Sequence, residues 1–568
     1  MIKKFFKVLF ISVALLAAAL FWYLQPATPA ASQIWLNGTI VTMDDNQPTA
    51  EAVMVRDDRI VALGNRADIE AMADSTTITH DLAGKTLLPG FVDSHSHFPG
   101  SGMALFLADL RSPPVGPVAN MPQLLERVAA QVAKTPAGEW VGAYGYDQLM
   151  LKEKRHPSLQ ELDAIAPNHP VFLMHVSGHL GVANSAAFKQ VGFDQLTEDP
   201  AGGHIYRNDD GTANGLVEEN AALVFQLRAL DLGLGQFLGM VDFAREEYLA
   251  NGVTTAQASN VSGPYLQGLS LAMTLNKIPQ RLVIFPDYDT LGQELIDGKT
   301  TVQELAGEQR YIRAIKLVAD GSIQGFTGYL THPYHSAHNG DDSYRGYPRI
   351  PLDELKEKVL NIASAGYQAV IHGNGDASID DILDAIEYVQ NTLGKPVERT
   401  ILIHAQMARV DQLQRMKTLD VTPSFFSAHS YYWGDQHRDV LIGSARASMI
   451  SPARSAEEIG LRFSTHLDTP IVPMQPLLSA WASVNRRTAS GKTLGADERI
   501  SVYSALKAIT IDAAWQVYLD DEIGSITAGK YADFTVLAQN PLLHAETLKD
   551  IQIIETIIGG VSYFQSEK

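Results

Sequence analysis

The chain contains no cysteine among its 568 residues. Disulfide bonds and thiolate metal sites are therefore excluded. Any metal ion must be held by histidine, by carboxylates or by a modified side chain. The absence of cysteine does not exclude an exported protein, because exported proteins need not contain disulfides.

Basic residues are scarce relative to acidic ones. The 44 Lys and Arg residues against 64 Asp and Glu residues give a formal net charge of −20. This balance disfavours nucleic acid or an anionic membrane surface as the main partner. We therefore expect a small-molecule substrate, and a homodimer is left open. Hydrophobic residues make up 46% of the chain and charged residues 19%, which is an ordinary globular balance.

The N-terminus has the pattern of an export signal. Three lysines precede an apolar run from Val8 to Leu24, and small and polar residues follow it. This pattern fits a cleaved signal peptide, cut near Ala30 or Ala31, or an uncleaved membrane anchor. In both cases the lysines stay on the cytoplasmic side and the part of the chain after this segment is exported. We expect residues 1–31 to have this role, with the catalytic part periplasmic or anchored to the inner membrane.

Short buried-strand patterns alternate with helical patterns through the middle of the chain. Strands that alternate with helices indicate βα units and a parallel sheet, and eight such units indicate a (β/α)8 TIM barrel. The predicted fold class is therefore α/β, with the barrel over residues 87–522. The eight candidate strands are Leu87–His97, Val253–Ala258, Arg281–Phe285, Ala314–Ala319, Gln368–His372, Thr400–His404, Val421–Phe425 and Leu461–His466.

Two further regions accompany the barrel. Short strands and turns occupy residues 32–86 and return over residues 523–568, so we expect both chain ends to pair into one small β-sandwich domain. Residues 98–235 have a mixed helix and strand pattern, with a stretch rich in Gly, Asn and Asp at residues 199–215. We interpret residues 98–235 as an insertion after the first barrel strand, placed over the active face.

The first candidate barrel strand ends in His95-Ser96-His97. Residues i and i+2 of an extended strand point to the same face, so both imidazoles can bind one metal ion. A bare pair of this kind is often a chance surface feature. Catalytic groups of a barrel gather at the carboxyl ends of its strands, so the other strand ends decide the question. They carry four further candidate ligands, Lys316, His372, His404 and Asp468.

Each of these residues alone also fits a structural role, but together they predict a metal site. Burial lowers the pKa of a lysine. The neutral amine of Lys316 can then add carbon dioxide and become a carbamate that bridges two metal ions. Two divalent ions about 3.5–4 Å apart activate a shared water and polarise a substrate oxygen. The alternative is an unmodified Lys316 and one ion held by His95, His97, one further histidine and Asp468.

The phrases around these residues resemble the amidohydrolase superfamily. The closer resemblance is to its YtcJ-like branch, amidohydrolase family 3, which includes N-substituted formamide deformylases and exoenzyme-regulator-like proteins. It covers residues 34–563. The phrases that carry it are Leu88–His97, Ser177-Gly178-His179, Gly252–Thr255, Lys316 with Asp320-Gly321-Ser322, Ile371–Asp376, His404-Ala405-Gln406 and Gly524–Phe534.

The resemblance implies a binuclear centre, with zinc as the expected metal. The expected reaction is hydrolysis of a non-peptide C–N bond, in an amide, a formamide or a cyclic amide, by a water that bridges the two ions. One ion is expected on His95, His97 and Asp468 and the other on His372 and His404, with N-carboxylated Lys316 between them.

Several residues are expected to act on the substrate. Asp468 is a metal ligand and also the general base, which takes a proton from the water and returns it to the leaving nitrogen. His179 is expected to polarise the substrate, with a structural role in the insertion as the alternative. His429 and Trp433 are expected to line the pocket, with ordinary packing of a loop as the alternative. Arg207, in the Gly-rich stretch, is a further candidate for substrate binding.

The sequence departs from the branch at two places. Ile403 stands where Glu is usual, and His466-Leu467 stand where Gly-Ser is usual. Neither change removes a ligand, but both reshape the pocket, so no relative's substrate carries over. A deaminase or an esterase or lactonase on the same site is an alternative, as is a non-catalytic exported regulatory protein. The intact ligand set argues against the regulatory protein.

Overall fold

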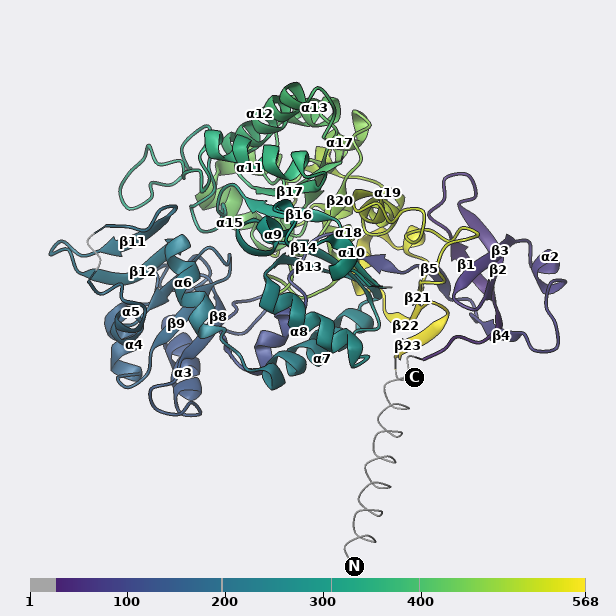
Figure 1. Ribbon diagram of the computed structural model, residues 1–568, viewed down its shortest axis with the longest axis horizontal. Coiled ribbons are helices and arrows are strands. Elements are labelled where there is room, and N and C mark those ends of the chain that lie inside the picture. The colour runs from purple at the N-terminus through teal and green to yellow at the C-terminus, as the bar shows by residue number, and fades with distance from the viewer. Residues whose placement is uncertain (1–26, 196–197, 308, 398, 567–568) are drawn as a thin grey trace, which may run out of the picture.

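The computed structural model describes residues 27–195, 198–307, 309–397 and 399–566 (Figure 1). The predicted signal peptide or anchor, residues 1–31, lies mostly outside the described residues. Within the described ranges, no single helix is long and apolar enough to cross a membrane. The bent pair Asn220–Ala229 and Leu234–Ala250, with an angle of 101° between its helices, passes the same length and composition test.

The core of the molecule has a TIM-barrel-type α/β fold, and each predicted barrel strand overlaps a strand of the structure. The first predicted strand, Leu87–His97, is too long, because Leu87–Pro89 belong to the sheet beside the barrel and only Phe91 and Val92 pair with a barrel strand. The eighth, Leu461–His466, is reduced to Ser464–Thr465. All pairings among these strands are parallel, in the orders β15-β14-β13-β6 and β16-β17-β18-β19-β20. The strands are β6 (Phe91–Val92), β13 (Val253–Val261), β14 (Arg281–Pro286), β15 (Arg310–Ile312), β16 (Ala314–Val318), β17 (Gln368–Gly373), β18 (Thr400–His404), β19 (Val421–Phe425) and β20 (Ser464–Thr465).

Short contacts connect the two parallel sheets on both sides. A parallel bridge joins Asp287, after β14, to Lys316 of β16. At the other junction, the Ser94 hydroxyl donates to the Thr465 carbonyl over 3.1 Å. The Asp468 amide donates to the His95 carbonyl over 3.2 Å. The ends of the first and eighth predicted strands are therefore neighbours.

Most residues of the longer barrel strands are buried, as expected for parallel strands covered on both faces. In β17 and β18 every residue is buried. Helix α11 buries the single stripe Leu355, Val359, Ile362 and Ala363. Helix α12 ends at Gly394 in the left-handed conformation. The main helices of the barrel are α7 (Leu234–Ala250), α8 (Gly263–Thr274), α11 (Leu352–Ser364), α12 (Asp376–Leu393), α13 (Val410–Thr418), α17 (Ala453–Glu458), α18 (Pro476–Asn485), α19 (Val502–Ala508) and α20 (Ile511–Gln516).

Both chain ends contribute to one mixed sheet beside the barrel, in the order β23-β22-β21-β5-β1-β2-β3 with β4 paired to β1 (Figure 1). The two ends meet where β21 runs antiparallel to β5, with Phe534 opposite Pro89. The sandwich form of this module stays a prediction. Its strands are β1 (Ser32–Val41), β2 (Thr49–Arg56), β3 (Arg59–Gly64), β4 (Ile78–Asp81), β5 (Thr86–Pro89), β21 (Phe534–Leu537), β22 (Ile553–Ile558) and β23 (Val561–Gln565), and α2 (Arg66–Glu70) packs against β2 and β3.

Residues 98–235 form a six-stranded sheet with helices around it, in the order β11-β12-β10-β9-β8-β7. The Asn120 side chain caps the helix over residues 121–132 by accepting from the Gln123 amide. The elements are β7 (Ala108–Asp109), α3 (Met121–Val132), β8 (Val141–Tyr146), α4 (Leu159–Ile165), β9 (Val171–His175), β10 (Leu180–Ala183), α5 (Ser185–Val191), β11 (Gly203–Arg207), β12 (Ala213–Glu219) and α6 (Asn220–Ala229).

Candidate metal centre

Five of the six predicted ligands lie at or just after the carboxyl ends of barrel strands, whereas Lys316 lies in the middle of β16. We call the six residues the strand-end cluster. Parallel strands place these ends at one face of a barrel. The charge of Lys316 contributes to lowering the pKa of Asp468 and of three histidines of the cluster, His95, His372 and His404. The structure therefore brings together the whole predicted set, His95, His97, Lys316, His372, His404 and Asp468.

One part of the cluster is centred on Asp468. Its Oδ1 lies 3.3 Å from Nε2 of His95 and 3.2 Å from Nε2 of His97. Donor atoms bound at about 2.0–2.1 Å to one tetrahedral ion lie roughly 3.3 Å apart. The ligand atoms of His95, His404 and Asp468 all lie within 4.8 Å of one another, so His404 lies next to this part of the cluster. These spacings fit donors that share a metal ion.

A second pair of donors has the same spacing. Nε2 of His404 lies 3.1 Å from Nδ1 of His372. Both residues are on adjacent strands, where Gly373 of β17 pairs with His404 of β18. Two imidazole nitrogens this close, with both rings buried, fit two ligands of one ion better than two side chains with independent roles.

Burial sets the protonation of the cluster. It lowers the pKa of His95, His372 and His404 well below the ordinary value, so these imidazoles are neutral and have a free lone pair. Burial lowers the pKa of Lys316 to about 7. Its Nζ has no hydrogen-bond partner among the described residues. A buried amine of this kind suits a modified, ligating lysine better than a structural one.

Asp468 remains an acceptor in spite of its burial. Burial raises the pKa of its carboxyl, but the hydrogen bond and charge of His97, with His466 and Lys316, lower it further than burial raises it. Its backbone has φ of 54°, and that of His404 has φ of 72°, both in the left-handed region that favours glycine. Such strained positions concentrate at functional sites.

Further hydrogen bonds orient the two paired histidines. Nε2–H of His372 donates to the Gly321 carbonyl over 3.0 Å. Nδ1 of His404 lies 3.0 Å from Nε2 of His466, whose Nδ1 lies 2.9 Å from the Ser424 hydroxyl. Partners of this kind fix which nitrogen of a ligating histidine faces the metal. Sequence reasoning noted His466 only as a departure from the branch and did not predict this contact.

A cavity of about 320 Å³ opens beside the cluster. Its lining includes ligands of the cluster together with three residues predicted to meet the substrate, His179, His429 and Trp433. The indole nitrogen of Trp433 donates to Asp147 over 2.9 Å, which fixes the ring in the cavity lining. His179 comes from the insertion and its ring lies 5.0 Å from that of His372.

Arg207 is placed differently from the other candidates. Its guanidinium donates to Asp199 over 2.7 Å and to the Ile205 carbonyl over 2.8 Å, within the hairpin of β11 and β12. It is not among the residues that line the cavity. The structure therefore does not bring Arg207 together with the strand-end cluster.

A TIM-barrel-type fold with this donor set at its strand ends defines a metal-dependent hydrolase. The sequence model of the Amidohydrolase family matches residues 79–564. The chain belongs to this family.

Individual relatives cover almost the whole chain. The N-substituted formamide deformylase of Arthrobacter pascens is 28% identical over 538 residues, which cover 93% of this chain and 98% of that protein. The putative amidohydrolase YtcJ of Bacillus subtilis is 26% identical over 544 residues, with coverages of 93% and 98%. The crystal structure of an uncharacterized metal-dependent hydrolase from Pyrococcus furiosus has a TM-score of 0.68 at 25% identity, covering 90% of this chain and 100% of that chain. The resemblance to the YtcJ-like branch is confirmed.

Proposed function

We propose that the protein hydrolyses a C–N bond outside peptide linkages, in an amide, a formamide or a cyclic amide, at the strand-end cluster. The observation that carries this proposal is the pair of ligand-like spacings, around Asp468 and between His372 and His404. The similarity to an N-substituted formamide deformylase over 93% of the chain supports the choice of bond.

The donor set fits two divalent ions, with zinc as the expected metal. When bound, the ions supply Lewis acidity that lowers the pKa of water and polarises a carbonyl. The neutral Lys316 amine attacks the carbon of carbon dioxide and releases one proton, which leaves an anionic carbamate with two oxygens. His95, His97 and Asp468 would hold one ion and His372 and His404 the other, and carboxylated Lys316 would be a ligand to both.

The protein's own residues handle the proton and the substrate. Asp468, ionised and at the cavity lining, accepts the proton of the attacking water and delivers it to the leaving nitrogen. His179 contacts the substrate oxygen from the insertion side. Trp433 and His429 also line the cavity and hold the rest of the substrate.

The proposal extends to the setting of the enzyme. The apolar run from Val8 to Leu24 supports an exported protein, periplasmic or anchored to the inner membrane through residues 1–31. Its substrate is a small molecule, because the net charge of −20 disfavours nucleic acid and an anionic membrane surface as partners.

A hydrolysis screen tests the proposal. Protein loaded with zinc and bicarbonate is assayed against matched amides, formamides, cyclic amides, esters, lactones and amino-substituted heterocycles, with chelator-treated protein as the control. We expect turnover of an amide-type compound that chelation abolishes. Turnover of esters or lactones alone would assign an esterase or lactonase, release of ammonia from the heterocycles alone would assign a deaminase, and no turnover at all would overturn the proposal.

A further inference from the structure

Glu219 ends β12 and lies directly before α6, and its backbone is unusual. Its φ of 50° and ψ of −123° fall in a region that side-chain-bearing residues rarely adopt. A non-glycine residue persists there only where the surrounding structure holds it. The strained backbone directs attention to what the side chain does.

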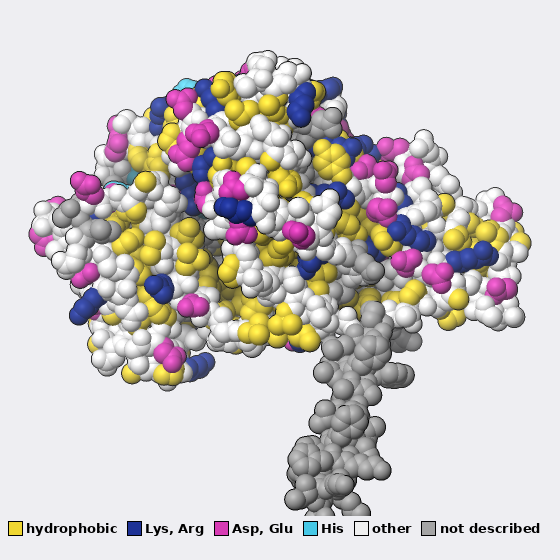
Figure 2. Space-filling model, in the orientation of Figure 1, with side chains coloured by type: hydrophobic (Ala, Val, Ile, Leu, Met, Phe, Trp, Pro, Cys, Tyr) yellow, Lys and Arg dark blue, Asp and Glu magenta, His cyan; other side chains and the backbone are white. Residues whose placement is uncertain are grey.

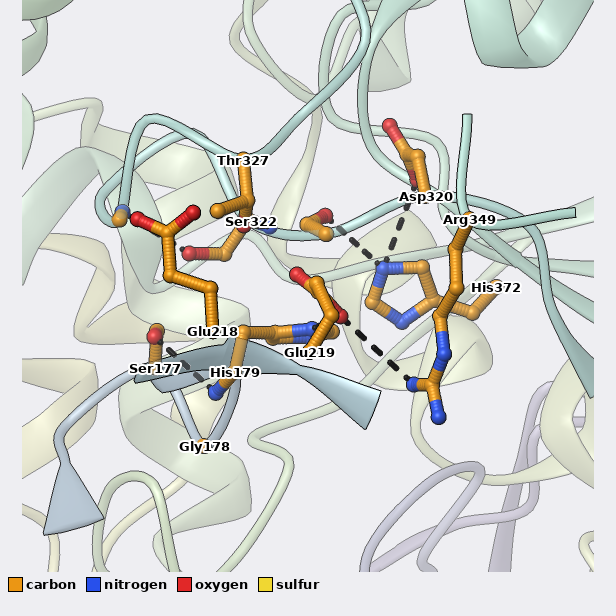
Figure 3. Close-up of polar contacts among 12 residues, drawn as sticks. Ser177, Gly178, His179, Glu218, Glu219, Asp320, Ser322, Thr327, Arg349 and His372 are labelled. Atoms are coloured by element: carbon orange, nitrogen blue, oxygen red, sulfur yellow. Dashed lines mark hydrogen bonds and ion pairs between the residues drawn. The ribbon is translucent and has the colours of Figure 1, made fainter. Parts of the chain in front are cut away.

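The Glu219 side chain is buried and lies between two cationic or donor groups (Figure 3). Its Oε2 accepts from Nδ1–H of His179 over 3.0 Å, and Nη1 of Arg349 lies 3.7 Å from the same oxygen. Burial raises the pKa of Glu219, but His179 and Arg349 lower it further than burial raises it. The carboxylate therefore stays ionised and acts as an acceptor.

This contact determines which nitrogen of His179 faces the substrate. Because Nδ1–H is committed to Glu219, the atom left for the cavity is Nε2. The main chain reinforces the arrangement, since the Glu219 amide donates to the His179 carbonyl over 2.7 Å. The Ser177 hydroxyl accepts from the His179 amide over 3.3 Å. His179 is thus held at both its backbone and its ring.

Arg349 connects this pair to the barrel. It follows β16 in the chain, and its amide donates to the Ala319 carbonyl over 2.7 Å. Its guanidinium also donates twice to Asn220 Oδ1, over 3.1 and 2.8 Å, at the start of α6. The insertion and the barrel therefore meet at the Glu219 carboxylate.

We propose that Glu219 is a positioning residue that acts through His179, fixing its ring with Nε2 toward the substrate. The inference rests on the proposed function, because it assigns the substrate contact to His179. It adds a residue to the site that the strand ends do not supply.

The neighbouring carboxyl provides a matched control. Glu218 is also buried, but successive residues of a strand point to opposite faces. Its oxygens accept from the hydroxyls of Tyr206 over 2.9 Å and Tyr347 over 3.3 Å. Burial raises the pKa of Glu218 to about 8, so at pH 7 it is protonated and Glu218→Gln is a near-isosteric change.

The kinetic experiment is a double-mutant cycle with Glu219→Gln and His179→Ala, measured on the substrate that the screen identifies. We expect Glu219→Gln to lower kcat by about 10- to 100-fold with a smaller change in KM, and to cause no further loss in the His179→Ala background. Glu218→Gln should keep the parent kcat. Additive losses in the cycle, or a parent-like kcat for Glu219→Gln, would overturn the inference.

A measurement on the unmutated protein keeps the inference testable if Glu219→Gln does not fold. Nitrogen NMR of histidine-labelled parent protein, with His179 assigned by comparison with His179→Ala, should show a protonated Nδ1. An unprotonated Nδ1 at His179 would overturn the inference. Because this readout needs no turnover, it separates failure of the positioning role from failure of the proposed function, which the screen detects by itself.

Discussion

The cavity has two sides that are built in different ways. Its floor is the strand-end cluster, where residues such as His372 and His404 are placed by the register of adjacent parallel strands. Its wall comes from the insertion, where His179 meets Glu219, 40 residues further along the chain. The floor supplies donor atoms through local strand geometry, whereas the wall supplies orientation through contacts between distant segments. Figure 2 shows one face of the molecule, on which acidic and basic side chains are interspersed.

The largest effect is expected at the floor. Asp468→Asn removes the proton acceptor but keeps an oxygen ligand, so kcat should fall by about 10²–10⁴-fold while metal is partly retained. Steady-state kinetics with metal analysis of the same samples measures both. The control is Asp199→Asn, at a carboxylate that pairs with Arg207 in the insertion. A parent-like kcat for Asp468→Asn would show that another residue is the general base. The proposed difference in role between the strand-end cluster and the insertion residues would then be lost.

A second prediction concerns the contact behind the floor. His466→Ala deletes the partner of His404 Nδ1 and should weaken metal binding by about 10- to 100-fold. Competition with a chromophoric chelator gives the affinity. His437→Ala is the matched control, because His437 is equally buried but hydrogen-bonds to Gln406. Equal affinities for parent and His466→Ala would show that the strand register alone orients His404.

The smallest effect is expected in the wall and concerns pH. Burial raises the pKa of Glu218 from 4.5 to about 8, with Glu219 raising it and Tyr206 and Tyr347 lowering it. Between these two pH values the folded state binds more protons than the unfolded state, so the free energy of unfolding falls as pH rises. The Glu218→Gln variant lacks this pH-dependent decrease in the free energy of unfolding, because glutamine does not titrate.

Denaturant unfolding at pH 5 and pH 9 measures the difference. The stability of the parent relative to Glu218→Gln should fall by at least about 1 kcal/mol over this range, since one pKa unit corresponds to 1.36 kcal/mol. Parallel stability profiles would mean that Glu218 is hydrated and that the wall is more open than the structure describes.

The fold and the floor could be predicted from the sequence for a physical reason. A barrel strand appears in the sequence as a short apolar run, and the residue at its carboxyl end follows within one or two positions. A phrase such as Val370-Ile371-His372 therefore contains both the strand and the predicted ligand. The observed β17, Gln368–Gly373, begins at the predicted residue. Convergence of the ends then follows from parallel pairing and needs no further information.

The wall could not be predicted in the same way. Glu219 becomes informative only when His179 and Arg349 lie beside it, and both contacts cross between segments far apart in the sequence. In the sequence, Glu218 and Glu219 are only two consecutive glutamates after Leu216-Val217, at the end of the Gly-rich stretch that also contains Arg207. His466 departs from the pattern of the branch, but its contact with His404 depends on how the residues that follow β20 lie beside the end of β18 in the folded chain.

Metal stoichiometry tests the central claim most directly, that six strand-end donors hold two divalent ions. The parent protein and Lys316→Ala are reconstituted with zinc and bicarbonate, freed of excess metal and measured for metal per chain, with the mass of the Lys316 peptide determined under native-compatible conditions. The account predicts two equivalents and a carboxylated Lys316 in the parent, with loss of at least one equivalent in Lys316→Ala. One equivalent in the parent, with Lys316 unmodified, would contradict it.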